Sequence, residues 1–133
     1  MDMSTIITKP KVQIDQDILT ELLALTKEEK QVIVHCLFDA RNVLGAKIRI
    51  WPSTFLYDIG SAHRSELIHA DNISFCPEWT DVPHGKVAHF SLLFTGLPSN
   101  CSSFDLKEKI PQSGGFEVTG IKRNESDVYY VWV

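Results

Sequence analysis

The sequence has no long hydrophobic run, no closely spaced pair of cysteines and no excess of basic residues. No segment approaches the roughly 18 apolar residues that a membrane span requires. Residues 1–11 contain no apolar stretch of the length found in signal peptides, so we expect a soluble, cytoplasmic protein. Cys36, Cys76 and Cys101 are odd in number and far apart, which argues against a disulfide framework.

Basic residues are outnumbered and scattered. The 133 residues include 13 Lys and Arg against 17 Asp and Glu, which gives a formal net charge of -4. Because contact with a phosphate backbone needs clustered positive charge, the sequence disfavours nucleic-acid binding. It also contains no basic amphipathic segment suited to a membrane surface. We therefore expect neither a nucleic acid nor a membrane as partner.

The composition is that of a small globular protein. Hydrophobic residues make up 44% and charged residues 23% of the chain, so a buried core is expected. The length suits one domain. We predict that residues 17–133 form this domain and that residues 1–16 form an N-terminal arm or edge strand, where Pro10 argues against a long helix.

Short segments of alternating polar and apolar residues, separated by Gly and Pro, run through most of the chain. Eight or nine short strands at roughly 8–12-residue spacing are typical of a sandwich or barrel. We therefore predict an all-β fold. The expected strands are 31–38, 46–51, 53–58, 66–70, 87–94, 103–108 and a final hairpin of 116–121 with 128–133, and 71–85 is expected to be irregular.

Residues 17–30 leave two interpretations open. They are rich in helix formers, and Thr26 with Glu29 matches a capping box, which favours a short helix. The β-branched and aromatic run at 31–38 instead suits a buried strand, with the polar residues 27–30 as a hairpin connection. We favour two strands and keep the short helix near 17–30 as the alternative.

Four segments stand out together: residues 48–58 (IRIWPSTFLYD), 90–98 (FSLLFTGLP), 104–108 (FDLKE) and 114–116 (GGF). Their order resembles that of small bacterial immunoglobulin-like β-sandwich domains of unassigned function, which occur alone or beside a catalytic domain. The resemblance covers roughly residues 30–121. It implies a two-sheet, immunoglobulin-like antiparallel β-sandwich, and it would allow export. It implies no catalytic residue.

Metal binding is one hypothesis for the chemistry of the chain. His63, His69, Cys76, His84 and His89 lie in one stretch, and imidazole and thiolate ligands suit zinc. No pair among them has HxH, CxxC or HExxH spacing, and His89 is expected to be buried in an apolar strand. If a metal site exists, we expect His69, Cys76 and His84 as ligands. A small metal-binding protein or metal-dependent enzyme is therefore the alternative function.

Catalytic patterns are missing. His35 and Cys36 are neighbours on an expected strand and so point to opposite faces, with Cys36 expected in the core. Cys101 lies in a Ser- and Asn-rich loop where we expect exposure. Asp105 and Glu108 fit a solvated strand face better than an acid–base pair. We predict no catalytic residue and no cofactor, and we favour a protein that is not an enzyme over the metal-dependent alternative.

Aromatic residues are the most suggestive feature. Trp51, Phe55 and Tyr57 have the spacing of one strand face, although Pro52 can interrupt it, and Trp79 lies in the expected irregular segment. Core filling is the default interpretation, and a binding face is the other. We predict a non-catalytic binding or interaction module for a protein, peptide or glycan. The expected contact residues are Trp51, Phe55, Tyr57, Arg64, Trp79 and His84.

The C-terminal strand at 127–133 is apolar on both faces. A strand buried on both sides has this pattern, and so does an edge strand that pairs with a partner. The sequence therefore keeps a homodimer through residues 127–133 as a hypothesis.

Overall fold

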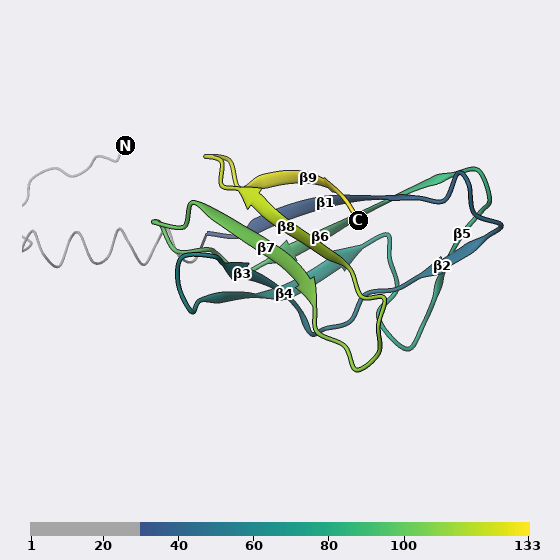
Figure 1. Cartoon of the computed structure of the whole chain (residues 1–133), viewed down its shortest axis with the longest axis horizontal. Helices are drawn as coiled ribbons and strands as arrows, with labels where there is room; N and C mark the ends of the chain where they lie inside the picture. Colours follow the sequence, from purple (N-terminus) through teal and green to yellow (C-terminus); the bar gives the residue numbers. More distant parts are fainter. Residues whose placement is uncertain (1–29) are drawn as a thin grey trace, which may run out of the picture.

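The computed structural model describes residues 30–133, so the expected arm at 1–16 and the choice between helix and strand at 17–29 lie outside the described residues. Within 30–133 the chain is all-β, as predicted, and contains no helix (Figure 1). None of the described residues belongs to a helix that is long and apolar enough to cross a membrane. The strands are β1 (Val32–Asp39), β2 (Ala46–Ile48), β3 (Thr54–Asp58), β4 (Arg64–Asp71), β5 (Thr80–Val82), β6 (Val87–Phe94), β7 (Ser103–Glu108), β8 (Glu117–Lys122) and β9 (Val128–Trp132).

Seven of these strands form one sheet, and the other two form a small second sheet. The large sheet has the order β8-β7-β3-β4-β6-β1-β9, and the small sheet pairs β2 with β5. All neighbours are antiparallel except β1 and β9, which run parallel. The described chain therefore ends in a strand that lies alongside the first one.

Alternation of side chains sets which face of the large sheet is buried. On β6, Phe90, Leu92 and Phe94 are buried, and the residues between them are more exposed. The register places Leu92 opposite Val34 and Phe90 opposite Cys36, so the apolar faces of β6 and β1 coincide. Cys36 is in the core as predicted.

The large sheet curls so that its two ends share this core. The ring of Phe104 on β7 meets the ring of Tyr129 on β9 edge-on, with centroids 5.0 Å apart. Phe116, just before β8, packs on Phe90 of β6 at 5.6 Å. In Figure 1 the β7–β8 end of the sheet lies over the β1–β6 end, in agreement with these contacts. Strands from both ends of the sheet therefore contribute side chains to a single hydrophobic core.

Two sequence-based expectations about strands are wrong. Strands β8 and β9 do not form a hairpin, because Val128 pairs with Ile33 in a parallel ladder with β1. The expected irregular stretch 71–85 contains β5, which pairs with β2. Three residues are too few for a periodic pattern, and parallel pairing between strands far apart in the chain leaves no local signal.

Candidate functional site: a tryptophan-lined groove

A groove with a volume of about 190 Å³ lies between the connection from β2 to β3, the end of the segment before β5, and the loop from β7 to β8. We call it the Trp51–Trp79 groove. The lining residues used below are Lys47, Arg49, Trp51, Trp79, Glu108 and Phe116.

Backbone bonds at Ile50 place the two tryptophans on the same side of the molecule. Ile50 is fully buried and forms an isolated parallel bridge with Phe75. Its N–H donates to the carbonyl of Ser74 at 2.8 Å, and its carbonyl accepts from the N–H of Cys76 at 2.9 Å. The segment that leads to Trp79 therefore runs beside the segment that leads to Trp51.

Arg49 joins the two indole rings. Its Cζ atom lies 3.9 Å from the ring centroid of Trp79 and 5.5 Å from that of Trp51, both within cation–π range. One of its Nη atoms also donates to the carbonyl of Pro77 at 3.2 Å. Because Ile48 and Ile50 point inward, Arg49 between them points outward. Trp79 remains 51% exposed, so a positively charged and aromatic wall faces solvent.

Glu108 connects the two loops that line the groove, and it is only 7% exposed. One carboxylate oxygen accepts from the N–H of Trp51 and the other from the N–H of Phe116, each at 2.9 Å. The Glu108 N–H also donates to the carbonyl of Phe116 at 2.9 Å. A single side chain thus ties both loops of the groove to the end of β7.

The interpretation of Glu108 as a solvated carboxylate is wrong. The alternation that turns Phe104 and Leu106 inward on β7 also turns Glu108 inward. The inward direction of Glu108 could be predicted from its position in the alternating pattern. The two backbone N–H groups that bind its carboxylate could not. Buried carboxylates need such partners, because an unpaired buried charge is costly.

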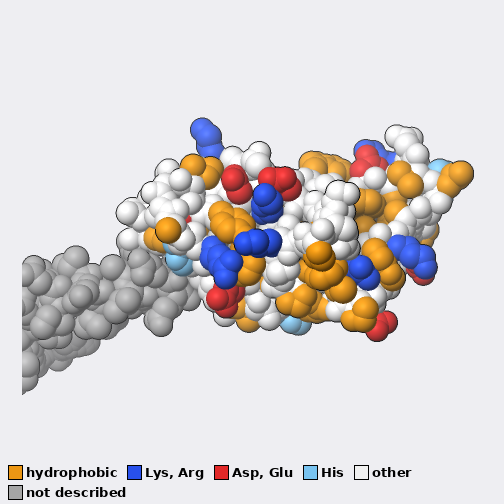
Figure 2. Space-filling model, turned by 60° about the horizontal axis from the view of Figure 1, so that its bottom comes forward, with side chains coloured by type: hydrophobic (Ala, Val, Ile, Leu, Met, Phe, Trp, Pro, Cys, Tyr) orange, Lys and Arg blue, Asp and Glu red, His pale blue; other side chains and the backbone are white. Residues whose placement is uncertain are grey.

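Phe55 and Tyr57 form a second aromatic cluster, on the outer face of β3. Their rings contact edge-on at 5.9 Å, which confirms that they share a face. Arg64 on β4 covers Phe55, with its Cζ atom 4.1 Å from the ring centroid. Trp51 does not join them, because a turn precedes β3 and the Thr54 hydroxyl donates to the Trp51 carbonyl at 2.6 Å. In Figure 2, Lys and Arg side chains lie among hydrophobic ones on one face of the molecule.

His84 belongs to neither aromatic cluster. It lies in the turn between β5 and β6, where its Nδ1 atom contacts the carbonyl of Val43. The six expected contact residues therefore lie in three places. Trp51 and Trp79 line the groove, Phe55, Tyr57 and Arg64 form the second cluster, and His84 lies apart from both.

The metal hypothesis finds no support in the described part of the chain. Within residues 30–133, no three His, Cys, Asp or Glu side chains are arranged to hold a metal ion. His69 faces outward on β4 opposite Leu93 of β6, whereas Cys76 follows the bridge to Ile50. His89 is exposed on the outer face of β6 and not buried as expected, because its neighbours alternate inward.

Two cysteines are buried and poorly suited to nucleophilic chemistry. Burial raises the pKa of the Cys36 thiol to about 12. Burial, together with a hydrogen bond to Asp58, also raises the pKa of Cys101. The expectation that Cys101 is exposed is wrong, because its loop folds over the core and leaves the residue 5% exposed. Reactive thiols have lowered pKa values and access to solvent.

We expect Cys76 alone of the three cysteines to react with a disulfide reagent in the native protein. Cys76 is partly exposed, whereas Cys36 and Cys101 are buried thiols with raised pKa values. Absorbance of the released thiolate, followed over time, measures this, and all three should react in denaturant. Rapid reaction of all three cysteines without denaturant would contradict the described burial.

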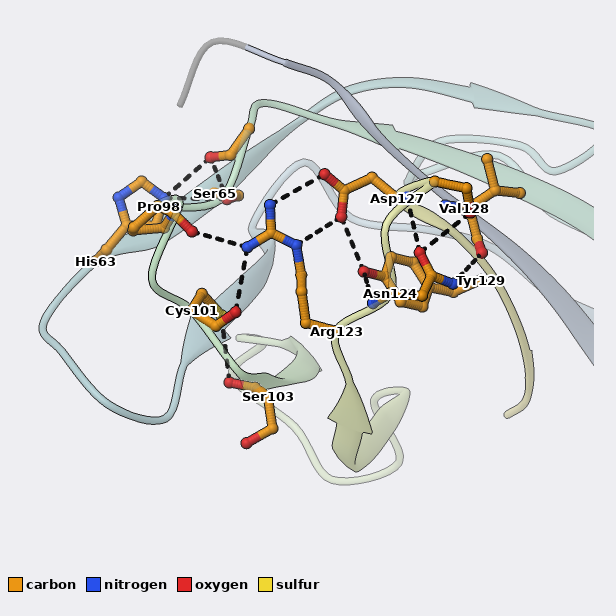
Figure 3. A network of polar contacts seen from close by, with 12 residues as sticks. His63, Ser65, Pro98, Cys101, Ser103, Arg123, Asn124, Asp127, Val128 and Tyr129 are labelled. Carbon is orange, nitrogen blue, oxygen red and sulfur yellow. Dashed lines mark hydrogen bonds and ion pairs between the residues drawn. The ribbon is translucent and has the colours of Figure 1, made fainter. Parts of the chain in front are cut away.

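An ion pair between Arg123 and Asp127 lies near the start of β7, at the other end of this strand from Glu108 and the groove (Figure 3). Arg123 donates to the two carboxylate oxygens of Asp127 at 2.6 and 3.0 Å, and to the carbonyl of Pro98 at 2.7 Å. The Tyr129 hydroxyl donates to Asp127 at 2.8 Å, and burial raises the pKa of Tyr129 to about 12. Within residues 30–133, no buried side-chain nitrogen or oxygen lacks a partner. We interpret this network as structural.

The groove brings together Trp51 and Trp79, and it adds Arg49, Glu108 and Phe116, which were not expected to contact a ligand. Comparisons of the chain with protein-family models, with curated proteins and with solved structures found no match. The geometry of the groove therefore carries the functional argument.

Proposed function

We propose that the protein is a non-catalytic binding module whose Trp51–Trp79 groove holds a short polypeptide segment with an acidic residue next to an apolar one. The observation that carries this proposal is the stacking of Arg49 on a half-exposed Trp79. Tryptophan and arginine are the residues most enriched among energetically dominant contacts. The apolar neighbour of the ligand would pack on the indole, and its carboxylate would approach the guanidinium.

The charges that line the groove support an acidic ligand. Arg49 and Lys47 both line it, and the carboxylate of Glu108 is already engaged by two backbone N–H groups. Lys47 approaches Asp81 only at 3.7 Å, and both side chains are largely exposed, so this pair is weak. Arginine can also bind a carboxylate through two parallel hydrogen bonds.

A polypeptide fits the groove better than a glycan does. The Arg49 guanidinium covers one face of Trp79 at 3.9 Å and places a positive charge beside the ring, which a peptide carboxylate can pair with and a neutral sugar cannot. Apolar side chains of a peptide can pack on the remaining edge and face of the indole. Catalysis gains no support here, because the one buried carboxylate of the groove is held by backbone donors.

We also propose that the curled sheet is an immunoglobulin-like sandwich, with β8-β7-β3 in one layer and β6-β1-β9 in the other. Contacts between the two halves support this, namely the ring of Phe104 on Tyr129 and the ring of Phe116 on Phe90. The similarity of four sequence segments to such bacterial domains supports the same assignment.

Selection of random peptides displayed on phage, followed by titration of synthetic peptides, tests the proposed function. We expect enriched peptides to pair Asp or Glu with an apolar residue and to alter tryptophan fluorescence on binding. Replacing Trp79 with Ala should weaken their binding by about tenfold or more, the usual effect of losing a dominant contact. Enrichment without acidic residues, or equal binding by the Trp79→Ala variant, would contradict the proposal.

The second aromatic cluster supplies a matched control. Arg64 stacks on Phe55 much as Arg49 stacks on Trp79, at 4.1 and 3.9 Å from the ring centroids. We expect Arg49→Ala to weaken peptide binding and Arg64→Ala to leave it unchanged. The reverse result would move the binding site to the outer face of β3. Parallel screening on a glycan array shows whether a sugar binds instead, which would also count against the proposal.

A further inference from the structure

The two edges of the large sheet differ in how well they are protected against pairing with another chain. The edge strand β8 begins with Glu117 and ends with Lys122, and Gly120 within it has a φ of 68°. Its ladder with β7 also shifts register between Phe104 and Leu106. Charges and irregularities of this kind are the usual devices that disfavour edge-to-edge pairing.

The opposite edge strand, β9, has none of these devices. From Val128 to Trp132 it contains no charged residue, glycine or proline, and it pairs with β1 without a break. The side chains of Tyr130 and Trp132 are 75% and 55% exposed. Tyr130 stacks on His35 of β1 with ring centroids 4.8 Å apart, so the aromatic face is ordered along the edge.

Backbone parity identifies the hydrogen-bonding groups that face outward. The ladder with β1 is bounded by the bonds from Ile33 N–H to the Asp127 carbonyl and from Val133 N–H to the Leu37 carbonyl. In a parallel ladder alternate residues of a strand bond to the same neighbour, so odd-numbered residues of β9 face β1. The N–H and C=O groups of Tyr130 and Trp132 therefore point to the open edge, where no strand of residues 30–133 pairs with them.

Val128 also has outward parity, but its backbone is already engaged by the preceding loop. Its N–H donates to the Ser126 hydroxyl at 3.3 Å, and its carbonyl accepts from the Asn124 side chain at 2.9 Å. The open edge is thereby limited to Tyr130 and Trp132.

We propose that β9 pairs antiparallel with β9 of a second copy of the chain, about a two-fold axis at Val131. Tyr130 of each copy then lies opposite Trp132 of the other, and each pair exchanges two backbone hydrogen bonds. The two Val131 residues face each other as a non-hydrogen-bonded pair. This register uses the open groups of β9 and leaves the bonds of Val128 intact.

A second copy suits this edge because the edge is complementary to itself. The register forms two Tyr–Trp cross-strand pairs, and aromatic pairs across strands are stabilising. No charged side chain of β9 is brought opposite its own copy. One strand per copy is a small contact, below the roughly 1,200 Å² typical of stable complexes, so the dimer is reversible and depends on concentration.

Sedimentation and light scattering of the full chain over a range of concentrations test the dimer. The mass should rise from the 15.1 kDa of one chain toward twice that value. Tyr130→Pro removes an N–H that the ladder with β1 does not use, and Trp132→Lys places charge at the edge. Both variants should weaken self-association by about tenfold or more. The control is Leu44→Lys, which changes a 91% exposed residue in the loop between β1 and β2 and should leave self-association unchanged.

Disulfide trapping tests the register, in a Cys36→Ala, Cys76→Ser background that removes the partly exposed native thiol and the thiol that lies beside position 131 in the ladder of β1 and β9. Non-hydrogen-bonded neighbours have Cα atoms about 4.5 Å apart, within disulfide range. Val131→Cys should therefore form a covalent dimer on mild oxidation, and Val128→Cys should not. Circular dichroism of each variant confirms folding.

Three results would overturn the proposal. The first is a full chain that is monomeric at every concentration, which is the result expected if residues 1–29 or another protein cover the edge. The others are a folded Trp132→Lys variant that still dimerises, and disulfide trapping through Val128 instead of Val131.

Discussion

Replacing Asp127 with Ala is expected to lower the free energy of unfolding by about 3–5 kcal/mol, the usual cost of removing one member of a buried ion pair. The side chains of Arg123 and Asp127 are only 16% and 3% exposed, so solvent screens the pair little. The substitution leaves the Arg123 guanidinium without its carboxylate and removes the acceptor of the Tyr129 hydroxyl. Urea unfolding followed by circular dichroism measures the loss.

A matched variant separates the charge from the backbone at this position. Asp127 has a φ of 56°, a conformation that Asn adopts more readily than Ala does. Asp127→Asn keeps this tolerance and one acceptor oxygen, so we expect it to lose less stability than Asp127→Ala. A loss below about 1 kcal/mol for Asp127→Ala would place the pair among weak surface contacts and contradict the described burial.

The second large effect is expected at Glu108. Glu108→Ala removes the acceptor of two backbone N–H groups, those of Trp51 and Phe116. Leaving a buried donor unpaired costs about 1–3 kcal/mol, so we expect a loss of about 2–4 kcal/mol in the free energy of unfolding. The tryptophan fluorescence of the folded state should also change, because Trp51 loses its anchor. Urea unfolding monitored by fluorescence measures both.

Two further variants define the contribution of Glu108. Glu108→Gln keeps one acceptor but turns an NH₂ group toward the other N–H, so its stability should lie between those of the wild type and Glu108→Ala. Lys107→Ala changes an exposed neighbour on the same strand and should have little effect. A Glu108→Ala protein as stable as the wild type would show that the two loops do not depend on this carboxylate.

Strand content could be predicted from the sequence where alternation was long enough. The boundaries of β6 and β7 agree with the expected strands at 87–94 and 103–108. The pairing of β9 with β1 could not be predicted, because it joins segments almost a hundred residues apart. Nothing in the local pattern of 128–133 distinguishes a parallel neighbour from an antiparallel one.

The candidate site was only partly predictable, for a related reason. The sequence singled out Trp51 and Trp79 among the expected contact residues. Their approach depends on the bridge between Ile50 and Phe75, which is a tertiary contact. Alternation with Ile48 and Ile50 turns Arg49 outward, and only the folded chain shows that it stacks on Trp79. Side-chain direction is thus a local property, whereas the partner that a side chain meets is not.

The parallel pairing of β1 and β9 determines how the domain bears tension. A pull on the start of β1 against the end of β9 acts at opposite ends of their shared ladder, which runs from Ile33 with Val128 to Leu37 with Trp132. Such a load shears all the hydrogen bonds between the two strands at once and does not unzip them one after another. The described domain is therefore built to resist stretching along this direction.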